Sequence, residues 1–393
     1  MNQLCINGFK YFFFMKKTSY KIYKKIEDKT IVWFEDTNNY LILENTAATI
    51  LKKIDKGVDR TQIAATLSKK TKVSLEQAKD FIVDFEKRIL NQKPFAKADK
   101  NYHGKDVKLP TSFNSSIHYQ INNSVFKISY LSALERSYIH PKFAHLVIDT
   151  ANKADYEFDV FIQDDFIYLF VEKKLVNRWA KADLHYFQGK LSMELLQKVH
   201  QKDEEEWLGV FHASALGDGK KAILFLGDSG NGKSTSLALL QAHGFDCIAD
   251  DFVPVDKKDQ HVYAFPAAIS IKRNSVETLL PFYPALNKSK EYDLKELNKI
   301  VRYLVPHHKN DSTHLPCKDL VFIKYQKNAT CCIDKISKTT AFMQLVPDSW
   351  LCPKKQNAKV FLDWFEYLNC YQLTYSDTNQ LVKVVSKLFK EEA

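Results

Sequence analysis

One eight-residue stretch has the residue types and spacing of a phosphate-binding loop. It is Gly227-Asp228-Ser229-Gly230-Asn231-Gly232-Lys233-Ser234, which fits the pattern of a glycine, any four residues and Gly-Lys-Ser. Glycines permit backbone torsions and close approaches that a side chain would forbid, so successive N–H groups can turn inward around a phosphate. Lys233 would reach the outer phosphates, and the Ser234 hydroxyl would face a magnesium ion. ATP and Mg²⁺ are the expected cofactors, with nucleotide contacts from this stretch and Thr235.

The residues on either side of the loop match the context that the motif requires. The apolar run Lys221–Leu226 predicts a buried strand, and Ser234–Leu240 predicts a helix whose N-terminus adds a positive dipole end. The alternative interpretation is a glycine-rich turn that fits the pattern by chance. The order of strand, loop and helix favours the phosphate site.

Two adjacent acids and a histidine could supply the rest of a phosphotransfer site. Asp250 and Asp251 end an apolar strand that begins at Gly244. One carboxylate of such a pair could hold magnesium while the other accepts a hydroxyl proton. Their mutual repulsion would raise one pKa, and the metal would oppose that shift. His212 lies in the predicted strand 208–214, which we expect to pair with the strand of the loop, near a phosphate or a carboxylate.

Composition limits the class of protein. The 393 residues suggest two or three domains, and seven cysteines without paired CxxC spacing argue against a disulfide framework or zinc site and favour a reducing cytoplasm. The apolar stretch Phe9–Met15 is too short for a signal or a membrane span, so no membrane partner is expected. The net charge of +10 suits acidic partners, although dispersed lysines are commonly solvated surface.

The chain divides by pattern into segments. After an N-terminal arm (1–17), alternating residues between Tyr20 and Leu43 predict a small antiparallel sheet, followed by three helices that begin near Asn45, Asp59 and Ser74. Gln77 completes a capping box with Ser74. We therefore expect a winged-helix-like unit over residues 18–95.

The remaining segments are a linker and two further domains. The stretch from Asn91 to Pro110 has no apolar period and predicts a linker, with 96–110 between the domains. Residues 111–206 form a β-rich segment with a predicted hairpin at 158–162 and 167–171 and a helix at 191–200; it would be a lid or flank without chemistry of its own. Residues 207–393 form the predicted α/β domain, with a strand at 320–323, an edge strand at 329–336 and closing helices at 337–345, 361–365 and 379–389.

The N-terminal unit resembles the pyrroloquinoline-quinone biosynthesis protein D family, whose members bind leader peptides of ribosomally made natural products. The resemblance rests on "YLILENTAATILKKIDKGVDRTQIAATLSKKTKVSLEQAKDFIVDFEKRIL". It implies that a peptide adds a strand to the sheet edge and packs against a helix. The groove would be lined by Val32, Phe34, Leu41, Ile82 and Phe85. These five residues could equally be core, and a DNA-binding winged helix is a further alternative. Interleaved acids at 76, 80, 84 and 86 count against nucleic acid as a partner.

The region around the loop resembles the catalytic core of HPr kinase/phosphorylase. The segment "VFHASALGDGKKAILFLGDSGNGKSTSLALLQAHGFDCIADDFVPVD" has the histidine, the phosphate loop and the Asp-Asp pair in that family's order. The resemblance implies ATP on the loop, magnesium between its phosphates, and an aspartate that deprotonates a serine hydroxyl. Lys233, Ser234, Asp250 and Asp251 take these roles, with His212 as an active-site partner. We favour Asp251 as base and Asp250 as metal-side ligand, and the opposite assignment stays open.

Further basic residues follow the acid pair. The segment "YAFPAAISIKRNSVETL" is similar to a related serine-kinase branch that is often fused to a leader-binding domain. In it, Lys272 is a candidate clamp for phosphate or substrate, or else a solvated surface lysine. Arg302 and the pair His307-His308, expected in a loop of the same domain, are weaker candidates. The Glu-x-Arg-Gly signature of the reverse, phosphorolytic activity is not found, so we expect a forward kinase.

The sequence thus predicts an α/β and α+β multidomain enzyme. The expected reaction is ATP- and magnesium-dependent phosphorylation of a hydroxyl, serine above all, on a precursor peptide held by residues 18–95. One alternative is a kinase of a small hydroxyl metabolite such as free serine or a sugar. Another is a non-catalytic, nucleotide-dependent regulatory protein. Assembly into a homo-oligomer is left open.

Overall fold

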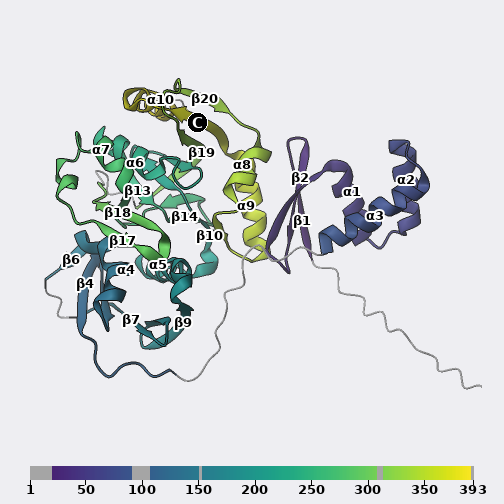
Figure 1. Ribbon diagram of the computed structural model, residues 1–393. Coiled ribbons are helices and arrows are strands. Elements are labelled where there is room, and N and C mark those ends of the chain that lie inside the picture. The colour runs from purple at the N-terminus through teal and green to yellow at the C-terminus, as the bar shows by residue number, and fades with distance from the viewer. Residues whose placement is uncertain (1–19, 91–106, 150–152, 308–312, 391–393) are drawn as a thin grey trace, which may run out of the picture. The chain divides into compact units, whose positions relative to one another are not determined.

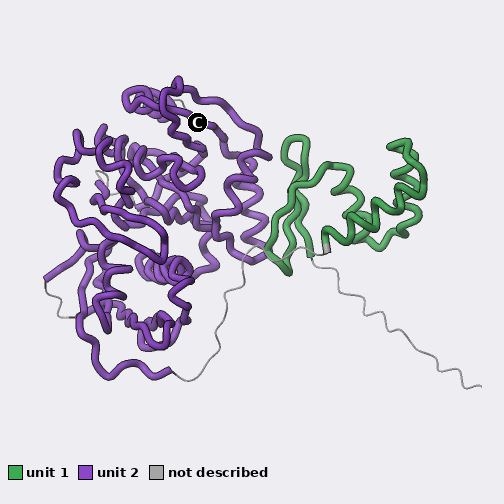
Figure 2. The backbone as a smooth tube through the Cα atoms, viewed as in Figure 1, with its two compact units in different colours: residues 1–95 green, residues 96–393 purple. Residues whose placement is uncertain are grey.

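The computed structural model describes residues 20–90, 107–149, 153–307 and 313–390. The chain forms two compact units, residues 1–95 and residues 96–393 (Figure 2). The predicted arm (1–17) and most of the predicted linker lie outside the described residues, as does His308. No helix in the described part of the chain is both long and apolar enough to cross a lipid bilayer.

The first unit is a three-stranded antiparallel sheet followed by three helices, in the predicted order. Its strands, in spatial order, are β1 (Lys21–Ile26), β2 (Lys29–Phe34) and β3 (Asn39–Glu44), and its helices are α1 (Asn45–Asp55), α2 (Arg60–Thr71) and α3 (Leu75–Leu90). The Asp59 carboxylate accepts hydrogen bonds from two backbone N–H groups at the start of α2. Ser74 and Gln77 bond each other's backbone N–H groups at 3.0 and 3.1 Å, which confirms the predicted capping box.

The side chains predicted to line a peptide groove mostly lie in the core of this unit. Val32 and Phe34 are buried with Leu51, and Ile82 is buried among the helices. Leu41 and Phe85 are only partly buried at the edge of the same cluster. Val32, Phe34 and Ile82 are therefore core residues. Strand β2 is the central strand, and its apolar face is covered by α1 and α3.

The second unit begins with a mixed six-stranded sheet (Figure 1). In spatial order its strands are β6 (Val147–Ile148), β4 (Ser115–Ile121), β5 (Ser124–Tyr130), β7 (Tyr156–Gln163), β8 (Phe166–Val171) and β9 (Lys174–Ala180). The predicted hairpin is confirmed as β7 and β8. Two helices accompany the sheet, α4 (Ala133–Phe143), which the sequence did not predict, and α5 (Leu184–His200), which begins at Leu184 rather than Leu191.

A ten-stranded sheet carries the phosphate loop. Its path is β13 (Asp246–Asp250), β11 (Ser214–Gly217), β12 (Ala222–Leu226), β19 (His314–Tyr325), β15 (His261–Tyr263), β14 (Val253–Asp256), β10 (Trp207–Phe211) and β21 (Ser349–Leu351). Off this path, β22 (Asn369–Tyr375) pairs with β19 and with β20 (Cys332–Lys335). The long strand β19 joins the two halves of the sheet, because it pairs in parallel with β12 and antiparallel with β15.

The predicted strand 208–214 is two strands, and this corrects the expected pairing. β10 pairs with β14 and β21, whereas β11 pairs with β12 and β13. The chain passes from one half of the sheet to the other at His212 and Ala213. His212 is therefore placed by a break between strands, not by a hairpin with the strand of the loop.

A small sheet and several helices complete the unit. The sheet has the order β16 (Ile269–Lys272), β18 (Lys299–Leu304), β17 (Tyr292–Leu294), so Arg302 lies in a strand and not in the expected loop. The helices are α6 (Lys233–Ala242), α7 (Val276–Leu279), α8 (Lys338–Leu345), α9 (Lys355–Tyr367) and α10 (Thr378–Lys390). Apolar residues of α6, β16 and α10 share one core with the central strands. The predicted boundary at residue 206 falls between two sheets of one compact unit and stays a prediction.

Candidate active site

The glycine-rich loop connects strand β12 to helix α6. Strand β12 is buried along its whole length between β11 and β19, so the loop starts from a fixed base. Gly227 has φ +133°, and a Cβ there would lie 2.8 Å from the carbonyl oxygen of Ile323. Gly232 precedes α6 with φ +94°. A side chain at Gly227 would clash and a non-glycine residue at Gly232 would be strained, so this loop shape requires glycine at both positions.

Lys233 is held inside the loop. It is buried, and its Nζ donates to the backbone carbonyl oxygen of Gly227 at 2.6 Å. Burial lowers the pKa of Lys233, and the charges of Asp251 and Asp250 oppose that shift. An ammonium group in a cradle of backbone groups is placed to meet phosphate oxygens, which would take over from the carbonyl as its partners.

Asp250 is the last residue of β13 and faces the start of α6. It is only 3% exposed. Its Oδ1 accepts hydrogen bonds from Ser214 Oγ at 2.6 Å and Ser234 Oγ at 3.0 Å, and its Oδ2 accepts from the Ser270 backbone N–H at 3.2 Å. Burial and the neighbouring charge of Asp251 raise the pKa of Asp250. The pairing with Ser234 brings together two oxygen ligands of the kind that magnesium prefers.

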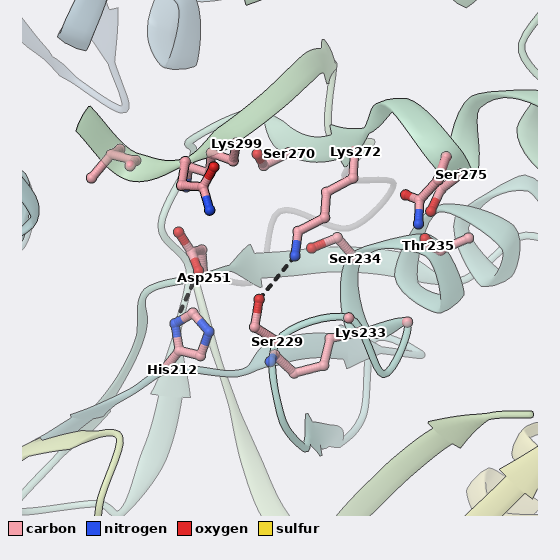
Figure 3. A pocket seen from close by; sticks show the side chains of 15 residues that line it. His212, Ser229, Lys233, Ser234, Thr235, Asp251, Ser270, Lys272, Ser275 and Lys299 are labelled. Carbon is pink, nitrogen blue, oxygen red and sulfur yellow. Dashed lines mark hydrogen bonds and ion pairs between the residues drawn. The ribbon is translucent and has the colours of Figure 1, made fainter. Parts of the chain in front are cut away.

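Asp251 turns in a different direction from Asp250. Its backbone has φ +67°, which takes the chain out of the strand, and its side chain is 35% exposed. Its Oδ1 lies 3.0 Å from Nδ1 of His212 (Figure 3). Burial raises the pKa of Asp251, but the hydrogen bond to His212 and the charges of Lys142 and Lys299 outweigh it and hold the pKa well below its usual range. Asp251 is therefore an ionised carboxylate.

The phosphate loop, His212 and Asp251 share one cavity of about 190 Å³. On the side opposite the loop, Lys272 extends from β16, and its Nζ donates to Ser229 Oγ at 2.8 Å (Figure 3). The lining residues are His212, Ser229, Gly230, Gly232, Lys233, Ser234, Thr235, Asp251, Ser270, Lys272, Asn274, Ser275, Leu297, Asn298 and Lys299. Gly227, Asp228 and Asn231 belong to the loop without lining the cavity.

Arg302, the second proposed clamp, does not line this cavity. Its guanidinium donates to the backbone carbonyl oxygens of Leu286 and Asn287 and lies 3.7 Å from the Glu291 carboxylate. These partners hold the chain between α7 and β17. His307 is also outside the cavity, and its backbone N–H donates to the Gln241 side chain.

Two lysines that sequence reasoning missed act on Asp251. Lys299 is the first residue of β18 and lines the cavity, and Lys142 comes from α4 of the six-stranded sheet region. The Lys142 carbonyl oxygen accepts from the Ala268 backbone N–H at 2.8 Å, just before β16. Burial lowers the pKa of Lys142, and the charges of Asp251 and Asp250 oppose this shift. No motif marks either lysine, so no signal in the sequence could have identified them.

The residues present fit ATP and Mg²⁺. The loop offers backbone N–H groups, a buried lysine and the N-terminus of α6 to phosphates, and Ser234 with Asp250 offers oxygen ligands to a metal. Asp251 presents an ionised carboxylate to the same cavity. This arrangement can bind a nucleoside triphosphate and accept a proton from a hydroxyl group beside its terminal phosphate.

Comparisons with known proteins add a distant structural likeness. No protein-family model and no curated protein matches the chain. The solved structures that resemble it include the HPr(Ser) kinase/phosphatase from Coxiella burnetii, at 12% sequence identity and a TM-score of 0.18. That match covers 47% of this chain and 99% of the other. A likeness at this level does not define the chemistry of the present chain. Any assignment of chemistry therefore rests on the geometry of the site itself.

Proposed function

We propose that this protein is an ATP- and magnesium-dependent kinase that phosphorylates a hydroxyl group, with serine in a precursor peptide as the acceptor. The observation that carries the proposal is that the Asp251–His212 pair, at 3.0 Å, opens into the cavity of the phosphate loop. A carboxylate that faces the phosphate site can accept the proton of an attacking alcohol, and this supports phosphoryl transfer to a hydroxyl group.

The basic and oxygen-bearing groups of the loop would bind the nucleotide. Lys233 and the loop N–H groups would hold the phosphates, and Lys272, now on Ser229, is within reach of the same place. Ser234 and Asp250 would hold Mg²⁺, which when bound neutralises charge on the phosphates. Because Asp250 is buried and already accepts three hydrogen bonds, its carboxylate has a fixed direction.

Asp251 would act as the base. Its pKa is low, so it is ionised at neutral pH but is a weak proton acceptor. A weak base is adequate for phosphoryl transfer, because the attacking oxygen bears little new bond in a loose transition state and its proton leaves late. His212 would fix the orientation of this carboxylate, and Lys142 and Lys299 would keep it ionised.

Residues 18–95 would bring the peptide. In the three-stranded sheet of this unit, β1 and β3 are the outer strands, and an extended peptide could pair with either of them. Backbone pairing of this kind needs no large apolar groove, which suits a unit whose Val32, Phe34 and Ile82 are buried. Tethering would raise the local concentration of a weakly bound acceptor.

The test uses the full chain, residues 96–393 alone, and Asp251→Asn, each with ATP, Mg²⁺ and a precursor peptide encoded beside the gene. Mass spectrometry of the peptide should show added phosphate on a serine with the full chain, much less with residues 96–393, and very little with Asp251→Asn. Equal phosphorylation by the full chain and residues 96–393 would contradict the role of residues 18–95. Equal transfer by Asp251→Asn would contradict the role of the base.

A small-metabolite kinase is the second candidate. The cavity of about 190 Å³ is small, and three of the five expected groove residues are core. Labelled ATP offered with free serine and simple sugars separates this candidate from the first. Phosphate transfer to one of these compounds, with none to the precursor peptide, would favour it.

A further inference from the structure

Three side chains that commonly bind metals gather away from the active-site cavity. Asp259, His261 and His314 each offer one ligand atom, and these atoms all lie within 4.8 Å of one another. Asp259 is in the turn between β14 and β15, while His261 and His314 begin strands β15 and β19. The antiparallel pairing of Tyr263 with His314 aligns the two strands and brings the three residues together.

The surroundings of two of these side chains hold them in place. The Tyr263 hydroxyl donates to Asp259 Oδ2 at 3.0 Å. The ring of Tyr263 also stacks on the ring of His314, with centroids 4.6 Å apart and planes at 12°. Nδ1 of His314 lies 3.0 Å from Thr313 Oγ1, so a proton on Nδ1 would leave Nε2 free as a ligand. Such outer contacts orient ligands in metal sites.

The third side chain has a buried nitrogen without a partner. Nδ1 of His261 is inaccessible to solvent and makes no hydrogen bond within the described residues. The backbone N–H of His261 donates to Asp259 Oδ1 at 2.8 Å, which ties these two residues together. A buried nitrogen without a hydrogen-bond partner is uncommon, and a bound ligand would supply the missing partner. The side chains of Asp259 and His314 are partly exposed, which leaves an entry path.

From this arrangement we propose that Asp259, His261 and His314 form a binding site for Zn²⁺. Two imidazoles and one carboxylate suit zinc and related borderline cations, whereas Mg²⁺ and Ca²⁺ prefer sites made of oxygen alone. Water would complete a tetrahedral set. The site contains no cysteine. The cysteine spacing, which argues against a zinc site made of cysteines, therefore does not apply to it.

Local charge is compatible with a cation. Nζ of Lys202 lies over the Tyr263 ring, 4.7 Å from its centroid, and so places a positive charge near the site. It is paired with Asp256, a carboxylate that it contacts directly. The Lys202 charge is therefore compensated, and the Asp259 carboxylate is left to attract a metal.

Zinc at this site would connect the turn before β15 to the start of β19. Strand β19 runs beside β12, which leads into the phosphate loop. A bound ion would therefore cross-link the central sheet, and binding to the folded state alone would stabilise the chain. Zinc binding at this site does not depend on the proposed kinase activity.

The test is metal binding by the full chain after treatment with a chelator. Co²⁺, as a spectroscopic stand-in for zinc, should give visible absorption bands of a four- or five-coordinate site, and Zn²⁺ should displace it. Asp259→Asn, His261→Gln and His314→Gln should each weaken Zn²⁺ binding by about 100-fold or more, and Tyr263→Phe by about 10-fold, as is common for outer-contact losses. Zn²⁺ should raise the melting temperature of the natural chain and not that of the three ligand variants.

Two control variants separate this site from other histidines. His185→Gln changes an exposed histidine on α5, and His212→Gln removes the histidine of the active-site contact. Both should retain the Co²⁺ bands. Loss of the bands in His212→Gln but not in the three ligand variants would overturn the proposal, as would the absence of any Zn²⁺ binding by a natural chain that unfolds cooperatively.

Discussion

Adjacent residues can have opposite electrostatic surroundings, and Asp250 and Asp251 are an example. Asp250 is buried against three donors that point at its carboxylate, and its pKa is raised. Asp251 follows it with a left-handed backbone conformation, meets His212, and has a lowered pKa. Environments that push two acids apart in pKa allow them to take different roles. The proposed split between a metal ligand and a base follows from this difference.

Replacing the proposed base should abolish transfer without affecting nucleotide binding. Asp251→Asn keeps the side-chain volume but removes the proton acceptor, so we expect kcat to fall by about 10³-fold. Lys233→Ala removes a cation from the phosphate cradle and should weaken ATP binding as well as transfer. Transfer rates and ATP titration calorimetry measure the two effects. A loss of ATP binding in Asp251→Asn equal to that in Lys233→Ala would contradict separate roles.

The raised pKa of Asp250 predicts a pH-dependent stability. The folded chain holds this proton more tightly than the unfolded chain, so the contribution of the carboxyl is full below its ordinary pKa and is lost as the pH rises through the raised value. Asp250→Asn cannot ionise, and its amide can accept from the Ser270 N–H and donate to Ser214 and Ser234. Without nucleotide or metal, its melting temperature should exceed that of the natural chain by a margin that grows as the pH rises above the ordinary aspartate pKa of about 4 and levels off above the raised pKa.

Thermal unfolding followed by circular dichroism at a series of pH values gives this margin. The proposal is wrong if the difference in melting temperature between Asp250→Asn and the natural chain is constant across the pH range, or if Asp250→Asn becomes less stable than the natural chain as the pH rises. Either result would show that burial does not destabilise the ionised carboxylate. Ser214→Ala is a useful companion variant, because it removes one donor to Asp250 and should enlarge the pH dependence.

At the scale of elements, α4 and β18 matter to the site because they bring lysines to Asp251. Lys142→Gln and Lys299→Gln should each let the Asp251 pKa rise toward its ordinary value, since a nearby cation favours the carboxylate. The acid limb of the pH–kcat profile should then move to higher pH, while kcat near neutrality should change little, because a carboxyl group whose pKa is near the ordinary aspartate value of about 4 is still ionised there.

Lys220→Gln, in the exposed turn between β11 and β12, is the matched control and should leave the profile unchanged. An unmoved acid limb in both Lys142→Gln and Lys299→Gln would mean that Asp251 does not set that limb. Reduced rates without a change of profile would point to binding of the substrate by the lysines.

Strand β22 is connected to the helix of the phosphate loop by one buried contact. The hydroxyls of Tyr375 and Ser236 lie 2.7 Å apart, and both side chains are buried. Tyr375→Phe should lower the free energy of unfolding by about 1 kcal/mol, because Ser236 loses its partner. Urea unfolding measures it, and the double variant with Ser236→Ala provides the control. If the two losses simply add, the contact contributes nothing of its own.

At the scale of the whole molecule, the chain is two compact units with separate cores. Residues 96–393 form the unit drawn in purple in Figure 2. This unit contains the phosphate loop, both acids and all the residues that line the cavity. This unit should therefore fold by itself and be stabilised by ATP with Mg²⁺ to the same extent as the full chain, since ligand stabilisation depends only on concentration and affinity. Thermal shift assays compare the two. A fragment that unfolds without cooperativity would show that residues 1–95 are needed for folding.

The local motifs were predictable from sequence because they depend on neighbours in the chain. The strand, loop and helix around Lys233 lie where the motif places them, the second helix begins next to Asp59, and the capping box at Ser74 forms as expected. The histidine, the loop and the acid pair were recognisable by type and order. Glycine torsions, capping hydrogen bonds and hydrophobic periodicity all act within a few residues, so the sequence alone carries them.

Tertiary structure was needed to determine the direction and the contacts of each side chain. The sequence determined that a phosphate loop and a pair of acids exist. Only the packing of strands decided that Asp250 points to Ser234 and Asp251 to His212, that Arg302 faces away, and that Lys142 arrives from a distant helix. Pairing between strands far apart in the chain sets these contacts, and no local pattern encodes which strands will meet. The same holds for Asp259, His261 and His314, whose meeting depends on the register of β15 against β19.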